Sequence, residues 1–149
     1  MKSLILHSHE VNTLSETGIV TVVRTVANLC TNVPGVEYTF HETKDGMWEL
    51  GFGFQDGTGT FLRYIKCPFS QPGDVRWVRE TWVWGIHGAD CLYQADKQDE
   101  IFKFTGKWRS SSTMPQWASR FNVECVSVEV VKQLCADIWD WKIKYKKVG

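Results

Sequence analysis

The sequence predicts one mainly β domain of the α+β class, built as a small, partly open barrel with two short helices. Runs rich in β-branched and aromatic residues recur along the chain and are separated by turns that contain Gly, Pro and Asp. Hydrophobic residues make up 43% of the 149 positions, which is enough for one core. No linker, repeat or low-complexity tract interrupts the chain, so residues 1–149 are predicted to form a single domain.

The first part of the chain alternates strand and helix. Residues 4–7 are an apolar run that predicts a strand, and Ser8 is a suitable N-cap for a short helix that Gly18 would end. The β-branched stretch 20–26 predicts the next strand. In the segment 38–54, aromatic residues alternate with polar ones around a Lys-Asp-Gly turn, which is the pattern of a β-hairpin with one apolar face.

The middle of the chain predicts further strands. In the run 60–67, apolar residues occur at both odd and even positions and so on both faces of a strand, which is why we expect it to lie centrally in a sheet. Strands over 76–84, 91–95 and 101–105 follow it, and residues 106–117 are predicted to form a loop.

The C-terminal part carries the clearest patterns. Apolar positions switch parity near Cys125, which predicts a β-bulge, because one flat strand cannot bury both sets of side chains on one face. A short helix is predicted over 131–138. In the last strand, 139–146, apolar residues alternate with lysines, so this strand is expected to be half-buried.

Composition excludes several classes of protein. The 17 basic and 17 acidic residues cancel, whereas proteins that follow long duplex DNA usually carry a basic excess. The five cysteines are scattered, without a Cys-x-x-Cys pair, which argues against a zinc ribbon or a disulfide framework. The N-terminus does not fit a signal peptide and no apolar run is long enough to span a bilayer. A soluble cytoplasmic protein without metal, cofactor or membrane partner is expected.

Residues 71–82, Gln-Pro-Gly-Asp-Val-Arg-Trp-Val-Arg-Glu-Thr-Trp, resemble the signature strand of ASCH (PUA-like) domain proteins from bacteriophages and prophages. That strand has Gly-Asp, two variable residues and then Trp-Val-Arg-Glu. Segments 93–96, 108–110 and 114–120 follow in the order that the family shows. Together the similar segments cover about two thirds of the chain. The stretch 32–64 has no counterpart and is interpreted as a hairpin insertion.

The resemblance implies a β-barrel related to RNA-binding PUA domains, with a cleft for a nucleobase or nucleic acid. Some relatives hydrolyse acylated cytidine and others are nucleases, and both use the motif Gly-x-Lys-Thr-x-Thr-x-Arg or a close variant. Here the motif begins at Gly18 and retains Thr21 and, as a basic residue, Arg24. The lysine is replaced by Val20 and the second threonine by Val23. Valine neither transfers a proton nor attacks a substrate, so a binding role is favoured over catalysis.

The predicted cleft combines hydroxyl, charged and aromatic side chains from the retained motif and the similar segments. These residues are Thr21, Arg24, Arg76, Glu80, Trp82, Trp108, Arg109, Trp117, Ser119 and Arg120. Glu80 is either a cleft residue or a carboxylate that a nearby arginine neutralises. Tryptophans in this set are candidates for base stacking, whereas Trp48, Trp77, Trp139 and Trp141 are predicted to be core residues.

Three functions are compatible with this set. The first is a non-catalytic PUA-like module that recognises a nucleobase, a nucleotide or a short single strand of RNA or DNA. The second is a hydrolase or nuclease of the ASCH type, acting on modified cytidine or nucleic acid, with Glu80 as general base and Thr21 as the other candidate catalytic residue. The third is a phage protein that binds and inhibits a host defence factor in the host cytoplasm, with the aromatic hairpin as its contact surface.

Overall fold

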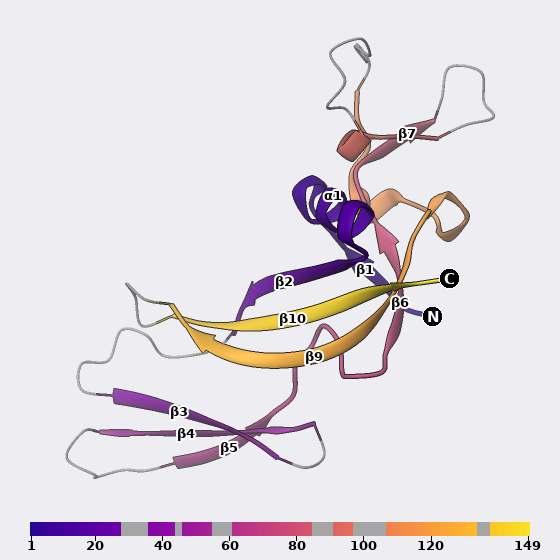
Figure 1. The fold of residues 1–149 in the computed structure, drawn as a ribbon. Coiled ribbons are helices and arrows are strands. Elements are labelled where there is room, and N and C mark those ends of the chain that lie inside the picture. Colours follow the sequence, from indigo (N-terminus) through magenta and orange to yellow (C-terminus); the bar gives the residue numbers. More distant parts are fainter. Residues whose placement is uncertain (28–35, 44–45, 55–60, 85–90, 97–106, 134–137) are drawn as a thin grey trace.

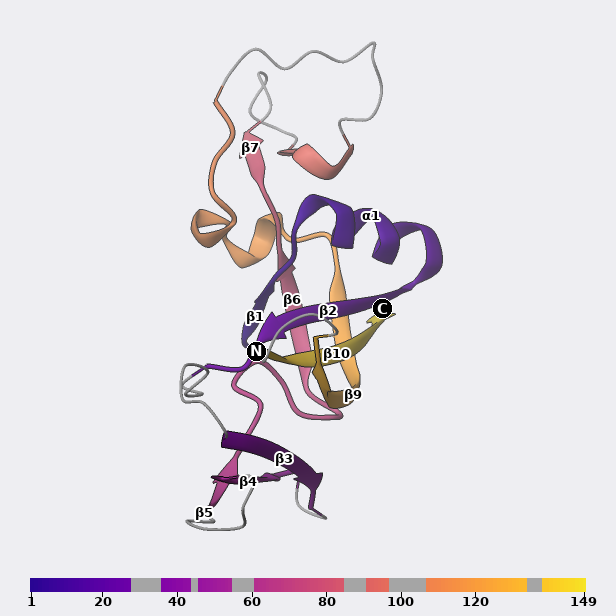
Figure 2. The ribbon, with the colours of Figure 1, turned by 90° about the vertical axis from the view of Figure 1, so that its left-hand side faces the viewer.

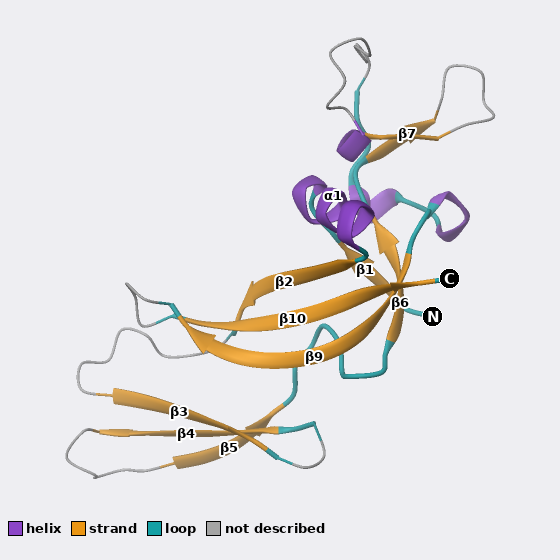
Figure 3. Ribbon diagram, in the orientation of Figure 1, coloured by secondary structure: helices purple, strands orange, loops and turns teal. Residues whose placement is uncertain are grey.

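The computed structural model describes residues 1–27, 36–43, 46–54, 61–84, 91–96, 107–133 and 138–149. Within these ranges strands predominate and there is one α-helix (Figure 3). The elements are β1 (Ser3–Ile5), α1 (Ser8–Thr17), β2 (Ile19–Thr25), β3 (Val36–Glu42), β4 (Trp48–Phe54), β5 (Phe61–Ile65), β6 (Val75–Arg79), β7 (Trp82–Trp84), β8 (Cys91–Tyr93), three short 3₁₀ turns at Gln94–Asp96, Ser111–Thr113 and Gln116–Ala118, β9 (Asn122–Lys132) and β10 (Trp139–Val148).

The described strands form three sheets, and the mainly β class is confirmed. The main sheet has the order β1-β6-β9-β10-β2, in which β1 runs parallel to β6 and the other pairs are antiparallel. Strands β3, β4 and β5 form a second sheet on one side of it, and β7 and β8 form a small third sheet on the other (Figures 1 and 2). Among the described strands the main sheet is not closed, because β1 and β2 end it without pairing to each other, so the predicted partly open barrel is not confirmed.

The longest strands confirm the C-terminal patterns. Along β10 the side chains of Trp141, Ile143 and Tyr145 are buried and the lysines between them are exposed. The predicted bulge is present: Tyr145 faces Cys125 on β9, whereas the preceding Lys144 faces Ser127. One residue of β9 is therefore extra at this point, which lets the strand change the face that it buries.

The N-terminal helix α1 begins and ends on local signals. The carboxylate of Glu10 accepts a hydrogen bond from the backbone N–H of His7 at 2.8 Å, so His7 takes the cap position one residue before the predicted Ser8. Gly18 ends the helix with φ of 75°, and its N–H donates to the carbonyl of Leu14 at 2.9 Å. The predicted second helix over 131–138 is wrong at its start, because β9 extends to residue 132; residues 134–137 lie outside the described part.

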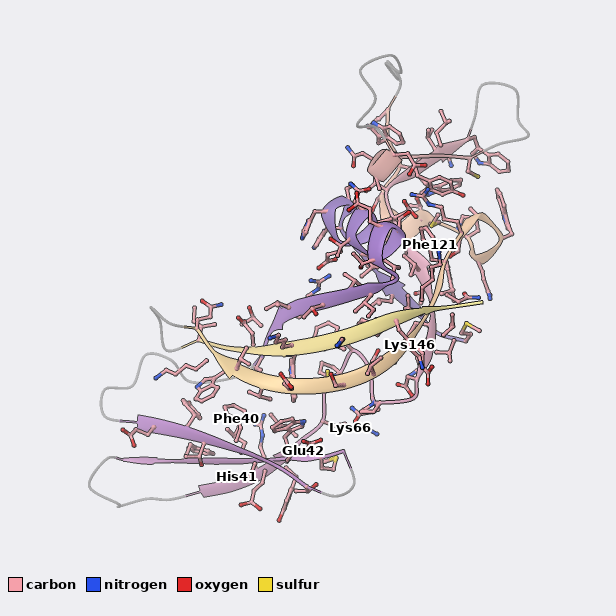
Figure 4. The ribbon with its side chains drawn as sticks, viewed as in Figure 1. Phe40, His41, Glu42, Lys66, Phe121 and Lys146 are labelled. Carbon is pink, nitrogen blue, oxygen red and sulfur yellow. The ribbon has the colours of Figure 1, made fainter. Side chains whose placement is uncertain are left out.

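The predicted hairpin is present as β3 and β4, and two of its aromatic residues, Phe40 and Trp48, pack against the core. The ring centroids of Phe40 and Trp139 lie 4.6 Å apart, and those of Trp48 and Trp141 lie 6.2 Å apart. Figure 4 shows Phe40 on the side of β3 that faces the main sheet and His41 on the other side. The predicted central position of the third run is wrong: β5 is an edge strand, and its Tyr64 is 60% exposed.

The predicted strand 76–84 is broken into β6 and β7. Strand β6 stays in the main sheet, whereas β7 pairs with β8 beyond the end of that sheet (Figure 2). The break falls at Glu80 and Thr81, where the Glu80 side chain turns into the protein instead of continuing the ladder. The predicted strand 91–95 becomes β8 followed by a 3₁₀ turn, and the predicted strand 101–105 lies outside the described residues.

No helix in the described ranges is both long and apolar enough to cross a membrane.

Candidate functional site

An ion cluster around the buried carboxylate of Glu80 lies at the break between β6 and β7. The guanidinium of Arg120 donates from Nε and Nη2 to the two carboxylate oxygens of Glu80, at 2.9 and 2.8 Å. Its Nη1 donates to both oxygens of Asp96 at 2.8 Å. The Glu80 side chain is 2% exposed. Of the two alternatives for Glu80, the structure therefore shows the carboxylate that an arginine neutralises.

The charged form of Glu80 depends on its hydrogen bonds from Arg120. Burial raises the pKa of Glu80, and the hydrogen bonds from Arg120 only partly offset that effect. Both carboxylate oxygens already accept hydrogen bonds, so the arrangement leaves Glu80 poorly placed to take a proton from a substrate. The guanidinium also lies 4.2 Å from the ring centroid of Tyr93, which adds a cation–π contact to the cluster.

Other predicted site residues fix the segment that precedes β9. The hydroxyl of Ser119 donates to the carbonyl of Val78 at 2.7 Å and thereby attaches this segment to β6. Trp82 is 2% exposed, and its Nε1 donates to the hydroxyl of Thr113 at 3.3 Å. Ser119, Trp82 and Arg120 thus hold their neighbours in place rather than presenting free groups to solvent.

Two exposed tryptophans lie on the buried Trp82. Trp84, at the end of β7, is 43% exposed, and Trp117 is 60% exposed. Their ring centroids lie 4.7 Å apart, and the Trp117 ring stands edge-on to Trp82 at 6.2 Å. Trp82 therefore supports a pair of large aromatic side chains that remain open to solvent.

A basic hollow lies beside the same buried ring. It has a volume of about 500 Å³ and is lined by Lys107, Trp108, Arg109, Ser110 and Thr113. The Arg109 guanidinium lies 5.7 Å from the ring centroid of Trp82, and the Arg109 backbone N–H donates to the Trp82 carbonyl at 2.8 Å. We call Trp84, Trp117, Lys107, Arg109, Ser110 and Thr113, together with Trp108, the tryptophan–arginine surface.

The remaining predicted site residues lie elsewhere. Arg24 of β2 forms an ion pair with Glu10 at 2.9 Å, and Arg76 of β6 forms one with Asp74 at 3.3 Å. Thr21 is exposed on the outer face of β2, directly opposite Lys144 of β10. The predicted cleft residues therefore lie in several separate places in the structure. One of these places is the tryptophan–arginine surface, which contains Trp108, Arg109 and Trp117 next to the buried Trp82.

The ion pair of Glu10 makes stability depend on pH. Burial raises the pKa of Glu10, but hydrogen bonds from Arg24 and from the His7 backbone outweigh burial and hold the pKa below its ordinary value. A carboxylate with a lowered folded-state pKa stabilises the fold above its unfolded pKa, and this contribution disappears as the pH falls. We expect Glu10→Gln to lower the free energy of unfolding by about 2 kcal/mol at pH 7.

That difference between wild type and Glu10→Gln should shrink as the pH falls below about 4.5, in urea unfolding followed by tryptophan fluorescence. Glu16→Gln on the exposed side of α1 is the matched control, since it should change the free energy of unfolding little at either pH. A difference that stays constant or widens in acid would contradict the assignment.

Four members of the tryptophan–arginine surface are absent from the set predicted from the sequence, namely Trp84, Lys107, Ser110 and Thr113. Trp84 follows Trp82 at the two-residue spacing of one strand face, which was a usable signal for a pair. Lys107 directly precedes the predicted Trp108 and Arg109.

Among the described residues, no group of three or more His, Cys, Asp and Glu could hold a metal ion. The rings of His7 and His9 are stacked, with their centroids 6.0 Å apart.

Comparisons with protein-family models, with curated proteins and with solved structures found no match to this chain.

Proposed function

We propose that the chain is a non-catalytic binding module of the ASCH (PUA-like) type that recognises a short single-stranded nucleic acid at the tryptophan–arginine surface. The observation that carries the proposal is the exposed pair of Trp84 and Trp117, which shares its support, Trp82, with the basic hollow at Arg109. The mainly β architecture and the order of the similar segments support the family part of the proposal.

Aromatic rings and cations are the two components that single-strand binding needs. Bases stack on exposed aromatic side chains, and each such contact contributes about 1–3 kcal/mol. Trp84 and Trp117 offer rings for stacking, while Lys107 and Arg109 offer positive charge for phosphates, and Ser110 adds a hydroxyl to the same hollow. The combination suits a strand whose bases are unpaired.

The size and charge of the surface favour a short ligand. The whole chain has a formal charge of zero, and the hollow contributes two cationic side chains. A long duplex needs many phosphate contacts, whereas a few stacked bases with one or two phosphates need only what this surface holds.

The two alternative functions have less support from the contacts. A hydrolase or nuclease with Glu80 as general base would first have to release this carboxylate from Arg120. A host-factor inhibitor was motivated by the aromatic hairpin, but Phe40 and Trp48 of that hairpin pack against the core. Binding of nucleic acid is therefore the function to test first.

The salt dependence of binding tests the phosphate contacts. In fluorescence-anisotropy titrations of a labelled, unstructured oligonucleotide at several salt concentrations, Arg109→Ala and Lys107→Ala should each reduce the slope of log K against log[salt] by about 0.7 to 1. Lys142→Ala, an exposed lysine on β10, is the matched control and should leave the slope unchanged. Equal slopes in all four proteins would place the phosphates elsewhere, and absence of binding by the wild type would overturn the proposal.

A further inference from the structure

The two ends of the main sheet approach each other across an open seam. Strands β1 and β2 are inclined to each other in Figure 2, and no ladder joins them. Arg24 of β2 bridges the seam, because its Nη2 donates to the carbonyl of Ile5 on β1 at 3.3 Å. The bridge leaves an opening beside it instead of a continuous sheet.

A pocket of about 420 Å³ lies in this seam, within the range of small-molecule sites. Its walls come from β1, β2, the cap residue of α1, the segment that leads into β6, and β6 itself. The lining residues are Ser3, Leu4, Ile5, His7, Val22, Arg24, Pro68, Phe69 and Arg76, and we call it the seam pocket.

The seam pocket combines an apolar wall with positive charge. Leu4 and Val22 are core residues that are 7% and 1% exposed, and the ring of Phe69 packs against the same core. Arg24 and Arg76 line the pocket, whereas their carboxylate partners do not. A ligand in the pocket therefore meets apolar side chains and two guanidinium groups, and no carboxylate is among the lining residues.

The two arginines have different roles in this pocket. The terminal nitrogens of Arg24 donate twice to Glu10 and once each to the carbonyls of Val23 and Ile5, so its hydrogen bonds hold the seam together. The Arg76 side chain is 12% exposed and donates from Nη2 to Asp74 at a longer 3.3 Å. A guanidinium is a planar fork that matches an oxyanion, and Arg76 has the donors to spare.

We propose that the seam pocket binds a small organic oxyanion, with the anionic group at Arg76 and a planar ring against Leu4, Val22 and Phe69. His7 and Ser3 also line the pocket and add polar groups to its wall. The anion is a phosphate or a carboxylate, which present the same chemistry to a guanidinium. The seam pocket shares no residue with the tryptophan–arginine surface, so this proposal does not depend on the proposed function.

Calorimetric titration of the full chain tests this proposal. Adenosine 5′-monophosphate, benzoate and inorganic phosphate are the three probes, and the protein carries both Trp84→Ala and Trp117→Ala so that stacking of the exposed pair at the other surface does not contribute. We expect one of the two ring-bearing anions to bind at least tenfold more tightly than inorganic phosphate, and the one that does identifies the anionic group. Failure of both ring-bearing anions to bind would overturn the proposal.

Three variants locate the binding. Arg76→Ala should weaken it at least tenfold, whereas Asp74→Asn removes the same ion pair, keeps the guanidinium and should leave binding equal or tighter. Ser3→Phe places a ring in the pocket without changing Arg76 and should block binding even if Arg76→Ala does not fold. Unchanged binding in Ser3→Phe, or equal losses in Arg76→Ala and Asp74→Asn, would contradict the site.

Discussion

Replacing Trp84 and Trp117 together by alanine is expected to weaken binding of a short, unstructured oligonucleotide by at least about 30-fold, because two stacking contacts of about 1 kcal/mol or more are lost. Both side chains are largely exposed, at 43% and 60%, so the free energy of unfolding should change by no more than about 1 kcal/mol. Anisotropy titrations and urea unfolding of the same preparations measure the two quantities.

Two controls make this result specific. Tyr64→Ala removes an aromatic side chain that is also 60% exposed, but on β5, and should not change the affinity. The double replacement by phenylalanine keeps two aromatic faces and should retain most of the binding. Wild-type affinity in the double alanine variant, or an equal loss in Tyr64→Ala, would show that exposed Trp84 and Trp117 do not stack on bases.

Arg120→Ala is expected to lower the free energy of unfolding by about 3–5 kcal/mol, because Glu80 would then be a buried carboxylate without its partner. Asp96→Asn removes the other partner of Arg120 but should cost no more than about 1 kcal/mol, since the Asp96 side chain is 59% exposed. Urea unfolding followed by tryptophan fluorescence measures both variants.

A paired replacement separates the lost charge balance from lost packing. Glu80→Met combined with Arg120→Leu removes both charges and fills the site with apolar atoms, so it should recover much of the stability that Arg120→Ala loses. An Arg120→Ala protein within about 1 kcal/mol of wild type would contradict the buried ion pair, because an uncompensated carboxylate costs more than that.

Local patterns predicted the strands well where one face of a strand is buried. The alternation along β10 and the parity switch near Cys125 follow from the two-residue period of a strand, and both are confirmed. The N-terminal helix and the β3–β4 hairpin were also predictable, because Gly18 and the Lys-Asp-Gly turn mark their boundaries within the sequence itself.

Features that depend on distant contacts were not predictable. The break between β6 and β7 depends on Glu80 meeting Arg120, which lies 40 residues away in the chain. The open main sheet depends on whether β1 and β2 pair, and no local pattern decides that.

The same limit applies to the predicted site. Basic residues can be recognised in a sequence, but their carboxylate partners cannot, so Arg24 and Arg120 were predicted to face a ligand. In the structure, Arg24 pairs with Glu10 and Arg120 with Glu80. The exposure of Trp117 and the burial of Trp82 likewise follow from how the segment before β9 packs, which local patterns do not specify.

The indole N–H signals in an NMR spectrum test binding at the tryptophan–arginine surface most directly. The chain has eight tryptophans, and the signals can be assigned by single replacements. Addition of a short, unstructured oligonucleotide should shift or broaden the signals of Trp84 and Trp117 and leave those of the core residues Trp48 and Trp141 in place. A saturating titration in which the Trp84 and Trp117 signals do not move would contradict the proposed function.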